Sequence, residues 1–235
     1  MPQRNRGKTS SDDKYFAPKW HPVFKEAADD LCFLLTRAYG KSSSLQLVGN
    51  RYRLNKRQRD ALQRICSSEQ EIIQRKTTEV DPSILSNAVV EIDGFNLLIL
   101  LESALSGAYI FKGRDGTIRD ISSVHGTYKR VRQTENAIEL VGNTLIELSV
   151  KSVKWYLDRP VSNSGLLRQR LLEMSEVNDY RWDVELVFDP DKELAKSKHI
   201  VISSDGWVLD QTKQWFNLGS YLLEQRIKDA NLIAV

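Results

Sequence analysis

Three apolar runs that each end in an aspartate constrain the fold of this chain more than any other feature. They close at Asp93, Asp158 and Asp205, in Val-Val-Glu-Ile-Asp, Val-Lys-Trp-Tyr-Leu-Asp and Ile-Val-Ile-Ser-Ser-Asp. Short apolar runs of this kind are typical of buried strands in parallel sheets. Ligands of open α/β sheets bind outside the carboxyl ends of the strands. The sequence therefore predicts that one edge of a sheet carries three carboxylates.

Helical patterns separate these strands. Apolar residues fill 95–105 almost all round, and three- to four-residue spacing recurs in 134–148 and 164–172. Further strands are expected at 184–188 and, as a short last one, at 215–218. Alternating strands and helices predict an α/β fold with a mainly parallel, doubly wound sheet. An inserted hairpin at 109–118 is indicated by its Asp115-Gly116 turn.

The first third of the chain has a different character. Residues 1–18 are rich in Arg, Lys, Ser and Asp, which predicts a disordered tail. Residues 19–80 carry helical periodicity and predict a small all-α domain that depends on packing against the rest. Residues 86–235 are expected to form the α/β domain. Residues 1–80 hold 16 Lys and Arg against 9 Asp and Glu, whereas the remainder holds 18 against 22, so a basic region precedes an acidic one.

Composition narrows the class of protein. The start of the chain lacks the apolar core of a secretory signal, and no uncharged apolar run approaches the ~20 residues of a membrane span. Cys32 and Cys66 are the only cysteines, and both lie in apolar helical patterns that suit reduced core thiols. We therefore expect a cytoplasmic protein with no membrane partner.

The acidic edge has the chemistry of a site for Mg²⁺ or Mn²⁺. Hard divalent cations take oxygen ligands and keep several waters, so a few carboxylates suffice. Asp93, Asp158 and Asp205 are the candidate ligands. Glu102 is a fourth, because a lone acid in an apolar helix needs a partner or a metal. The alternative is that each aspartate simply caps a turn or a helix after its strand.

Polar neighbours are expected to support these acids. Asn96 follows Asp93, and Ser204 precedes Asp205 and can hydrogen-bond a ligand carboxylate. A helix N-terminus after Asp158 favours an anion such as a scissile phosphate, although plain capping explains the same residues. Asp120 is a further candidate acid. The residues at that helix N-terminus are Ser162, Asn163 and Ser164.

Two stretches carry a family resemblance. Val90-Glu91-Ile92-Asp93-Gly94-Phe95-Asn96 resembles the opening strand of PIN-like nucleases, especially the branch that begins Asp-Gly-Tyr-Asn, and the endings at Asp158 and Asp205 resemble its later acidic strands. The whole chain resembles an uncharacterised prokaryotic family that joins a small helical domain to a PIN-like domain. That narrower match lies in 47–54, 119–121 and 160–165.

The resemblance implies a PIN-like three-layer α/β/α domain and a nuclease. Such enzymes cut RNA phosphodiesters with a metal-activated water, using Mg²⁺ or Mn²⁺. Asp93, Glu102, Asp158 and Asp205 match the family's acidic positions. The inserted hairpin and Gly206-Trp207, which replaces a polar continuation, depart from the pattern.

A basic cluster in the helical region predicts contact with a polyanion. Phosphate backbones attract such clusters without sequence readout, although a solvated helix face explains the same residues. The candidates for nucleic-acid binding are Arg51, Arg53, Lys56, Arg57, Arg59 and Arg64. The function expected is a metal-dependent endoribonuclease, with a non-catalytic RNA-binding adaptor, a phosphatase or a structure-specific DNA nuclease as alternatives. A homo-oligomer is compatible with the sequence.

Overall fold

A four-stranded parallel sheet forms the centre of the molecule in the computed structural model, which describes residues 5–122 and 126–235. Its strand order is β5-β4-β1-β6. The strands are β1 (Val89–Asp93), β4 (Ser152–Asp158), β5 (Trp182–Val187) and β6 (Ile200–Ile202). The three runs that end in aspartate are neighbours in this sheet, as their apolar, β-branched character predicts.

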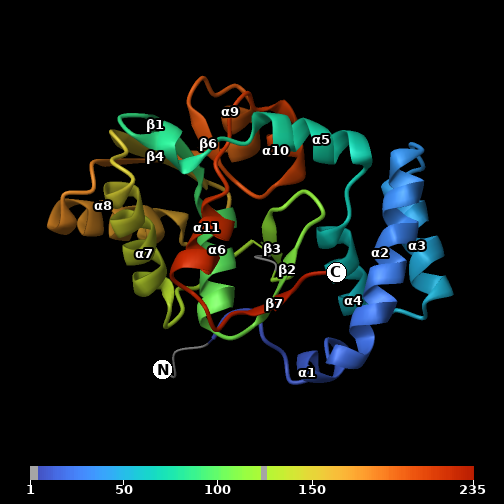
Figure 1. The fold of residues 1–235 in the computed structure, drawn as a ribbon. Helices are drawn as coiled ribbons and strands as arrows, with labels where there is room; N and C mark the ends of the chain where they lie inside the picture. The colour runs from blue at the N-terminus through green and yellow to red at the C-terminus, as the bar shows by residue number, and fades with distance from the viewer. Residues whose placement is uncertain (1–4, 123–125) are drawn as a thin grey trace.

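Helices cover both faces of the sheet, as Figure 1 shows. Side chains alternate between the faces. Ile200 and Ile202 pack into the larger core, whereas Val201 joins a smaller cluster with Leu194 and Trp215. The larger core lies under α6 (Gly94–Leu105), α7 (Thr134–Glu147), α8 (Ser164–Asn178) and α11 (Leu218–Gln225). The smaller lies under α9 (Pro190–Ala195) and α10 (Gly206–Gln211). The expected three-layer α/β/α fold is confirmed.

Gly94 lets helix α6 start directly against the neighbouring strand. A Cβ atom at this position would lie 2.6 Å from a methyl group of Leu157 and 2.9 Å from the carbonyl oxygen of Tyr156. Any larger residue would push the helix away from β4. The glycine after Asp93 therefore fixes where the first turn of α6 lies relative to the sheet edge.

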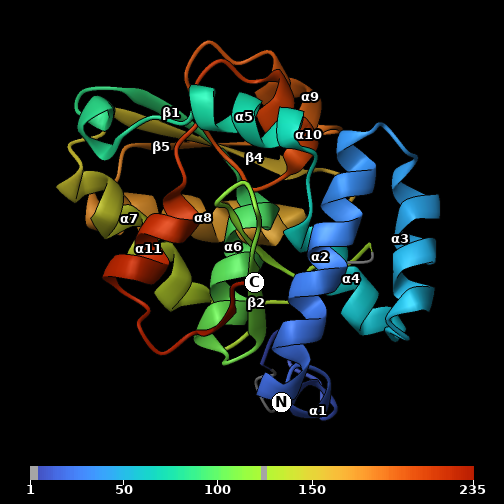
Figure 2. The same cartoon turned by 45° about the vertical axis from the view of Figure 1, so that its right-hand side comes forward.

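A second, smaller sheet joins the α/β region to the helical region. Its order is β3-β2-β7, with β2 (Tyr109–Lys112) antiparallel to β3 (Ile118–Asp120) and parallel to β7 (Asn231–Ile233). The two views in Figures 1 and 2 place this sheet between α6 and the helices of the first third of the chain. The hairpin is the expected insertion. Its function in the fold is to connect the two regions.

Residues 19–80 form four α-helices, and the periodicity predicts the first three of them but not the fourth. They are α2 (His21–Thr36), α3 (Lys41–Arg51), α4 (Lys56–Ile65) and α5 (Glu69–Thr78), followed by a 3₁₀ turn, η2 (Pro82–Leu85). Reciprocal capping hydrogen bonds start two of them, between Asn55 and Gln58 and between Ser68 and Glu71. Their core is completed from elsewhere, because Phe111 of β2 and Ile233 of β7 belong to the same apolar cluster.

The tail expected at 1–18 differs in the structure, where residues 5–18 pack onto the molecule. They contain a helical turn, α1 (Asp12–Tyr15), and the start of a 3₁₀ turn, η1 (Pro18–Trp20). Phe16 is buried against Phe111 and Phe24, and Asp12 is fully buried beside Arg57. The polar composition predicts disorder, but the few apolar and charged side chains of this segment find partners in the rest of the fold. Residues 1–4 lie outside the described residues.

One expected strand is absent from the described residues. Trp215 makes only isolated bridges, to Val201 and to Glu79, and helix α11 begins at Leu218. Within residues 5–122 and 126–235, no helix is long and apolar enough to cross a membrane.

Candidate active site at the carboxyl edge of the sheet

The crevice beside β1 is where the direction of strand addition reverses. The chain moves from β1 to β4 and β5 on one side, and β6 then lies on the other side of β1. Such switch points open at the carboxyl ends of the strands and are the usual ligand sites of open α/β sheets. Asp93 ends β1, and Asp205 follows β6 by three residues. Both acids therefore lie at the same edge of the sheet, on neighbouring strands.

Asp93 is a buried carboxyl group with an unusual affinity for its proton. Its side chain accepts a 2.9 Å hydrogen bond from the Ser203 hydroxyl and a longer one, 3.4 Å, from the backbone N–H of Asn96. Burial, together with the negative charges of Asp191 and Asp205, raises its pKa to about 8 from an ordinary 3.8. Strongly perturbed carboxyls in crevices mark candidate functional sites.

Two serines hold this crevice together. The Ser203 hydroxyl donates to Asp93 and accepts a 3.0 Å hydrogen bond from the backbone N–H of Asp205. Ser204 was expected to support a carboxylate, but its hydroxyl and backbone N–H both donate to the amide oxygen of Asn96, at 2.8 and 2.9 Å. Asn96 therefore lies beside Asp93, and Ser204 binds this amide instead of the carboxylate that the sequence predicts. Ser203, which the sequence analysis passed over, binds the acid.

Asp205 caps helix α10 and also faces a cavity. One oxygen, Oδ1, accepts from the backbone N–H groups of Trp207 and Val208 at 2.9 and 3.3 Å. The other oxygen has no hydrogen-bond partner among the residues that the structure describes. Residue 206 is a glycine next to the Arg75 side chain, and a Cβ at this position would lie 2.8 Å from the Arg75 guanidinium. This close approach explains one departure from the resembled family pattern.

Asp191 joins the acidic edge and was missed by the sequence analysis. It lies in α9, just after β5, and burial and the charges of Asp205 and Asp158 raise its pKa to about 6. Asp158 is half-buried at the end of β4, and burial and Asp189 raise its pKa. The signal was available in Phe188-Asp189-Pro190-Asp191, because that stretch also places acids directly after a strand. Four aspartates therefore influence one another across the ends of β1, β4, β5 and β6.

These four side chains do not form a ready cage. Within residues 5–122 and 126–235, no group of three or more His, Cys, Asp or Glu side chains is arranged to hold a metal ion. The donor set is nevertheless all oxygen, which suits Mg²⁺ or Mn²⁺, and these ions keep several of their waters when they bind one or two carboxylates. The residues therefore suit a divalent cation that keeps several of its waters better than one whose ligands all come from the protein.

Glu102 does not join the aspartates. Glu102 lies nine residues after Asp93, a rise of about 13 Å along a helix. At this position on α6 it belongs to a separate buried network. Its carboxylate receives hydrogen bonds from Arg6, Tyr128 and Thr134. Burial raises its pKa, and the Arg6 charge opposes that rise. The expectation that Glu102 assists a metal at the sheet edge is corrected: the lone acid of this apolar helix has an arginine partner.

The remaining polar candidates also differ from expectation. Asp120 lies in β3 of the second sheet, where it accepts a 2.5 Å hydrogen bond from the backbone N–H of Ser122. The N-cap of α8, Asn163, has a left-handed backbone (φ 70°) and makes no capping hydrogen bond; its amide donates instead to the carbonyl of Tyr128 at 2.8 Å. Ser164 is buried and Ser162 is exposed in the same turn. The hydroxyl of Ser164 donates weakly to the carbonyl of Arg159, at 3.4 Å.

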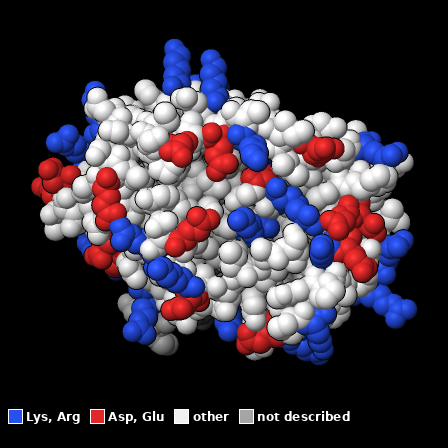
Figure 3. All heavy atoms as spheres, viewed as in Figure 1, with Lys and Arg blue, Asp and Glu red and all other residues white. Residues whose placement is uncertain are grey.

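The basic residues of the helical region have different environments. Arg57 is used inside the fold, on Asp12 and the carbonyl of Gly7, and Arg59 donates to the carbonyl of Leu54. Arg51 lies 3.4 Å from Asp30 at the surface. The exposed side chains in this group include Arg53, Lys56 and Arg64. Acidic and basic side chains are interspersed over the face shown in Figure 3, including the helices on its right, so this view has no continuous basic surface.

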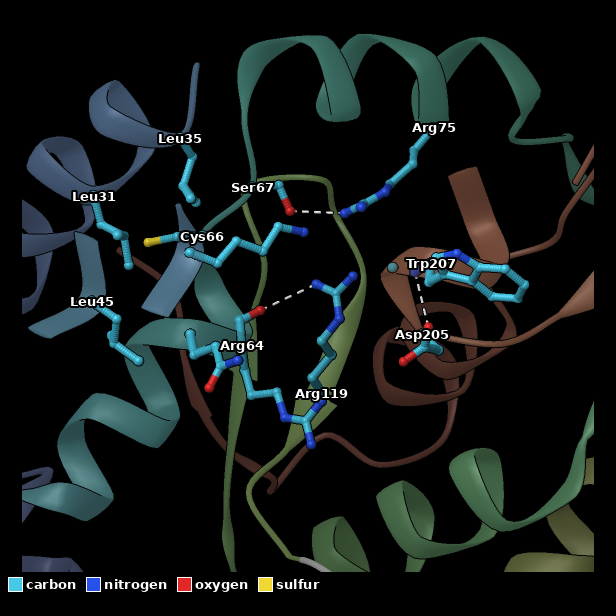
Figure 4. Close-up of a pocket in the computed structure, with 13 residues that line it drawn as sticks. Leu31, Leu35, Leu45, Arg64, Cys66, Ser67, Arg75, Arg119, Asp205 and Trp207 are labelled. Carbon is cyan, nitrogen blue, oxygen red and sulfur yellow. Dashed lines mark hydrogen bonds between the residues drawn. The ribbon is translucent and has the colours of Figure 1, made fainter. Parts of the chain in front are cut away.

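A cavity of about 250 Å³ lies between the helical region and the acidic edge. Figure 4 shows Leu31, Leu35 and Leu45 on one side of it and Asp205 on the other, with Arg64 and Arg119 between them. Arg119 joins the two regions, because its side chain donates to the carbonyl oxygens of Ser204 at 2.7 Å and Arg64 at 3.2 Å. The inserted hairpin therefore supplies one wall of the cavity.

Comparisons with known proteins identify a family and no activity. The profile described as "Domain of unknown function (DUF5616)" matches residues 82–221, and the one described as "Protein of unknown function (DUF434)" matches residues 23–77. An uncharacterised protein of Methanocaldococcus jannaschii, MJ0935, is 33% identical over 185 residues, which cover 79% of this chain and 88% of that protein. No solved structure gives a significant match.

Proposed function

The chain belongs to the family of the domain of unknown function DUF5616, and for this member we propose a metal-dependent endoribonuclease of PIN-like type. The observation that carries the proposal is the raised pKa of Asp93, to about 8, at the switch point of the sheet, where the charges of Asp191 and Asp205 act on it. Like charges that repel one another in a crevice favour the binding of a cation, which removes the repulsion.

The donor set supports Mg²⁺ or Mn²⁺ as the cofactor. Asp93 and Asp205 are the residues that would hold the ion, with Asp191 and Asp158 acting directly or through water. When bound, the cation would supply Lewis-acid stabilisation of the charge that develops on a phosphodiester. In this proposal the protein acts in the cytoplasm and its partner is RNA.

The chain's own residues have defined functions in this proposal. Ser203 orients Asp93 and fixes the backbone of Asp205, so the two acids keep their relative position. The amide of Asn96, held by Ser204, fixes the loop that follows β6. Support of this kind around ligand residues sets the affinity of a metal site. Deletion of the Ser203 hydroxyl is expected to weaken Mn²⁺ binding about tenfold or more.

Cleavage of RNA tests the proposal. Purified protein with Mn²⁺ and a labelled single-stranded RNA is expected to release fragments, and Asp205→Asn is expected to lower the rate by about a hundredfold or more. Asparagine caps helices as well as aspartate does, so α10 is expected to remain intact. Exposed Asp183, on the amino half of β5, provides the control Asp183→Asn.

Contrary results have distinct meanings. The nuclease proposal is wrong if wild-type protein cleaves no RNA and binds no Mn²⁺. RNA binding without cleavage, unaffected by Asp158→Asn, would instead support the non-catalytic adaptor. Cleavage of flap DNA in preference to RNA would support the DNA nuclease.

A further inference from the structure

We propose that the cavity between the helical region and the acidic edge binds one unpaired nucleotide of a single-stranded polynucleotide. Arg64 would contact a phosphate, and the apolar end at Leu35 and Leu45 would receive the base. This inference deepens the proposed function and rests on it for the chemistry, but the binding itself is independent of cleavage. It assigns a ligand class to a cavity that spans both regions of the chain.

The cavity has two ends of different chemistry. Leu31, Leu35, Leu45 and Cys66 line one end, from α2, α3 and the turn that ends α4. Asp205 lies at the other end, and Arg64 and Arg119 lie between the two. A nucleotide has the same division, because its base presents an apolar face and its phosphate is an anion. The polar end reaches Asp205, so a strand bound here would pass the proposed metal site.

Arg64 is the cation best suited to a phosphate. Arg75 is buried and bound to Asp115 at 2.6 Å and to Asp210 at 2.7 Å, and Arg119 is bound to Asp115 at 2.6 Å. Their charges are therefore already compensated. Arg64 is exposed and forms no ion pair within residues 5–122 and 126–235; at longer range its charge opposes the rise in the pKa of Asp120. A guanidinium that has no ion-pair partner in a cavity is a preferred partner for phosphate oxygens.

The cavity is pre-organised by the two compensated arginines. Arg119 hydrogen-bonds the backbone on both sides, at Arg64 and Ser204, and Arg75 connects α5 to the hairpin and to α10. Binding therefore requires little ordering of the protein, which favours affinity. Arg75 and Arg119 are expected to keep the walls in place rather than to contact the ligand.

Size restricts the ligand to an unpaired base. A cavity of about 250 Å³ is close to the lower limit for small-molecule pockets, and residues from both regions line it. A base inside a double helix cannot enter such a space, because an enzyme reaches it only after the base leaves the stack. Proteins commonly bind single strands instead, by stacking or apolar contact with unpaired bases and without sequence preference.

Binding of a fluorescent single-stranded RNA in EDTA tests this proposal without cleavage. Arg64→Gln is expected to weaken binding about tenfold and to lower the slope of log K against log salt by about one. Leu45→Gln is expected to weaken binding as well. The matched controls are Arg181→Gln, an exposed arginine just before β5 at the opposite edge of the sheet, and Leu47→Gln on the exposed face of α3.

The outcomes separate this proposal from the nuclease. Wild-type affinity in both Arg64→Gln and Leu45→Gln would overturn the cavity proposal, and so would a wild-type protein that binds no single strand. Full competition by inorganic phosphate alone would reduce the site to an anion site and also overturn it. Arg64-dependent binding by a protein that never cleaves with Mn²⁺ would support the cavity and refute the nuclease. Cleavage by Arg64→Gln with an unchanged KM would support the nuclease and refute the cavity proposal.

Discussion

Asp93 couples the stability of the protein to pH. Its folded-state pKa of about 8 lies above the ordinary 3.8, so between about pH 4 and pH 8 the folded chain keeps a proton that the unfolded chain has released. The free energy of unfolding of the metal-free protein is therefore expected to fall as pH rises through this window. Asp191, with a pKa of about 6, acts in the same direction.

Urea denaturation in EDTA at a series of pH values measures this effect. Asp93→Asn is expected to flatten the profile, because asparagine has no proton to lose, whereas Asp183→Asn in the exposed part of β5 leaves it unchanged. Added Mn²⁺ is expected to restore stability at pH 8 in the wild type only, through preferential binding to the folded state. A wild-type profile that rises from pH 4 to pH 8 would show that Asp93 is not protonated in the fold.

Glu102 is predicted to stabilise the fold rather than act in catalysis. Removal of its carboxylate would leave the half-buried Arg6 guanidinium and the hydroxyls of Tyr128 and Thr134 without this acceptor. Glu102→Ala is therefore expected to cost about 3 kcal/mol or more of stability. Calorimetric titration of Mn²⁺ into the folded variant is expected to give the wild-type affinity. Loss of Mn²⁺ binding in folded Glu102→Ala would show that Glu102 contributes to the metal site.

At the scale of elements, the segment before α2 is a structural part of the molecule. Phe16 is 1% exposed and packs against Phe24, Tyr109 and Phe111. Phe16→Ala is expected to destabilise the protein by about 3–5 kcal/mol, through lost burial and a cavity. Phe33, which is 56% exposed on α2, provides the control, and Phe33→Ala is expected to change the unfolding free energy little. Equal effects of the two substitutions would mean that residues 5–18 are not docked.

The sequence was a good guide to elements wherever local pattern decides structure. Apolar runs located β1, β4 and β6, and Asn55 caps α4 as its position before an apolar helical pattern predicts. It was a poor guide where a distant partner decides. Nothing local to Phe16 shows that Phe111 will cover it, and nothing in α6 shows that Arg6 will reach Glu102.

At the scale of the molecule, the two regions share a core and buried ion pairs. The helical region completes its core with Phe111 and Ile233 from the second sheet. Buried ion pairs connect Arg75 of α5 to Asp115 and Asp210. A fragment of residues 19–80 is therefore expected to lack cooperative thermal unfolding by circular dichroism, whereas the full chain unfolds in one transition. A cooperative transition in the fragment would show that the helices form an independent domain.

The candidate site was only partly predictable for the same reason. Strand ends in the sequence located Asp93, Asp158 and Asp205, because parallel strands bring their carboxyl ends to one edge. The same pattern of acids after a strand was present at Asp189 and Asp191, whereas the partner of Ser204 required the register of β6 against β1. Arg64 gains its significance only from the cavity, which two regions of the chain form together.

Anomalous diffraction from a crystal soaked in Mn²⁺ shows whether aspartates at the ends of neighbouring strands share a divalent cation. A manganese peak between Asp93 and Asp205, within reach of Asp191 and lost in Asp93→Asn, is the expected result. A fully soaked crystal with no peak at this edge, or with manganese bound only at surface carboxylates elsewhere, would contradict the claim.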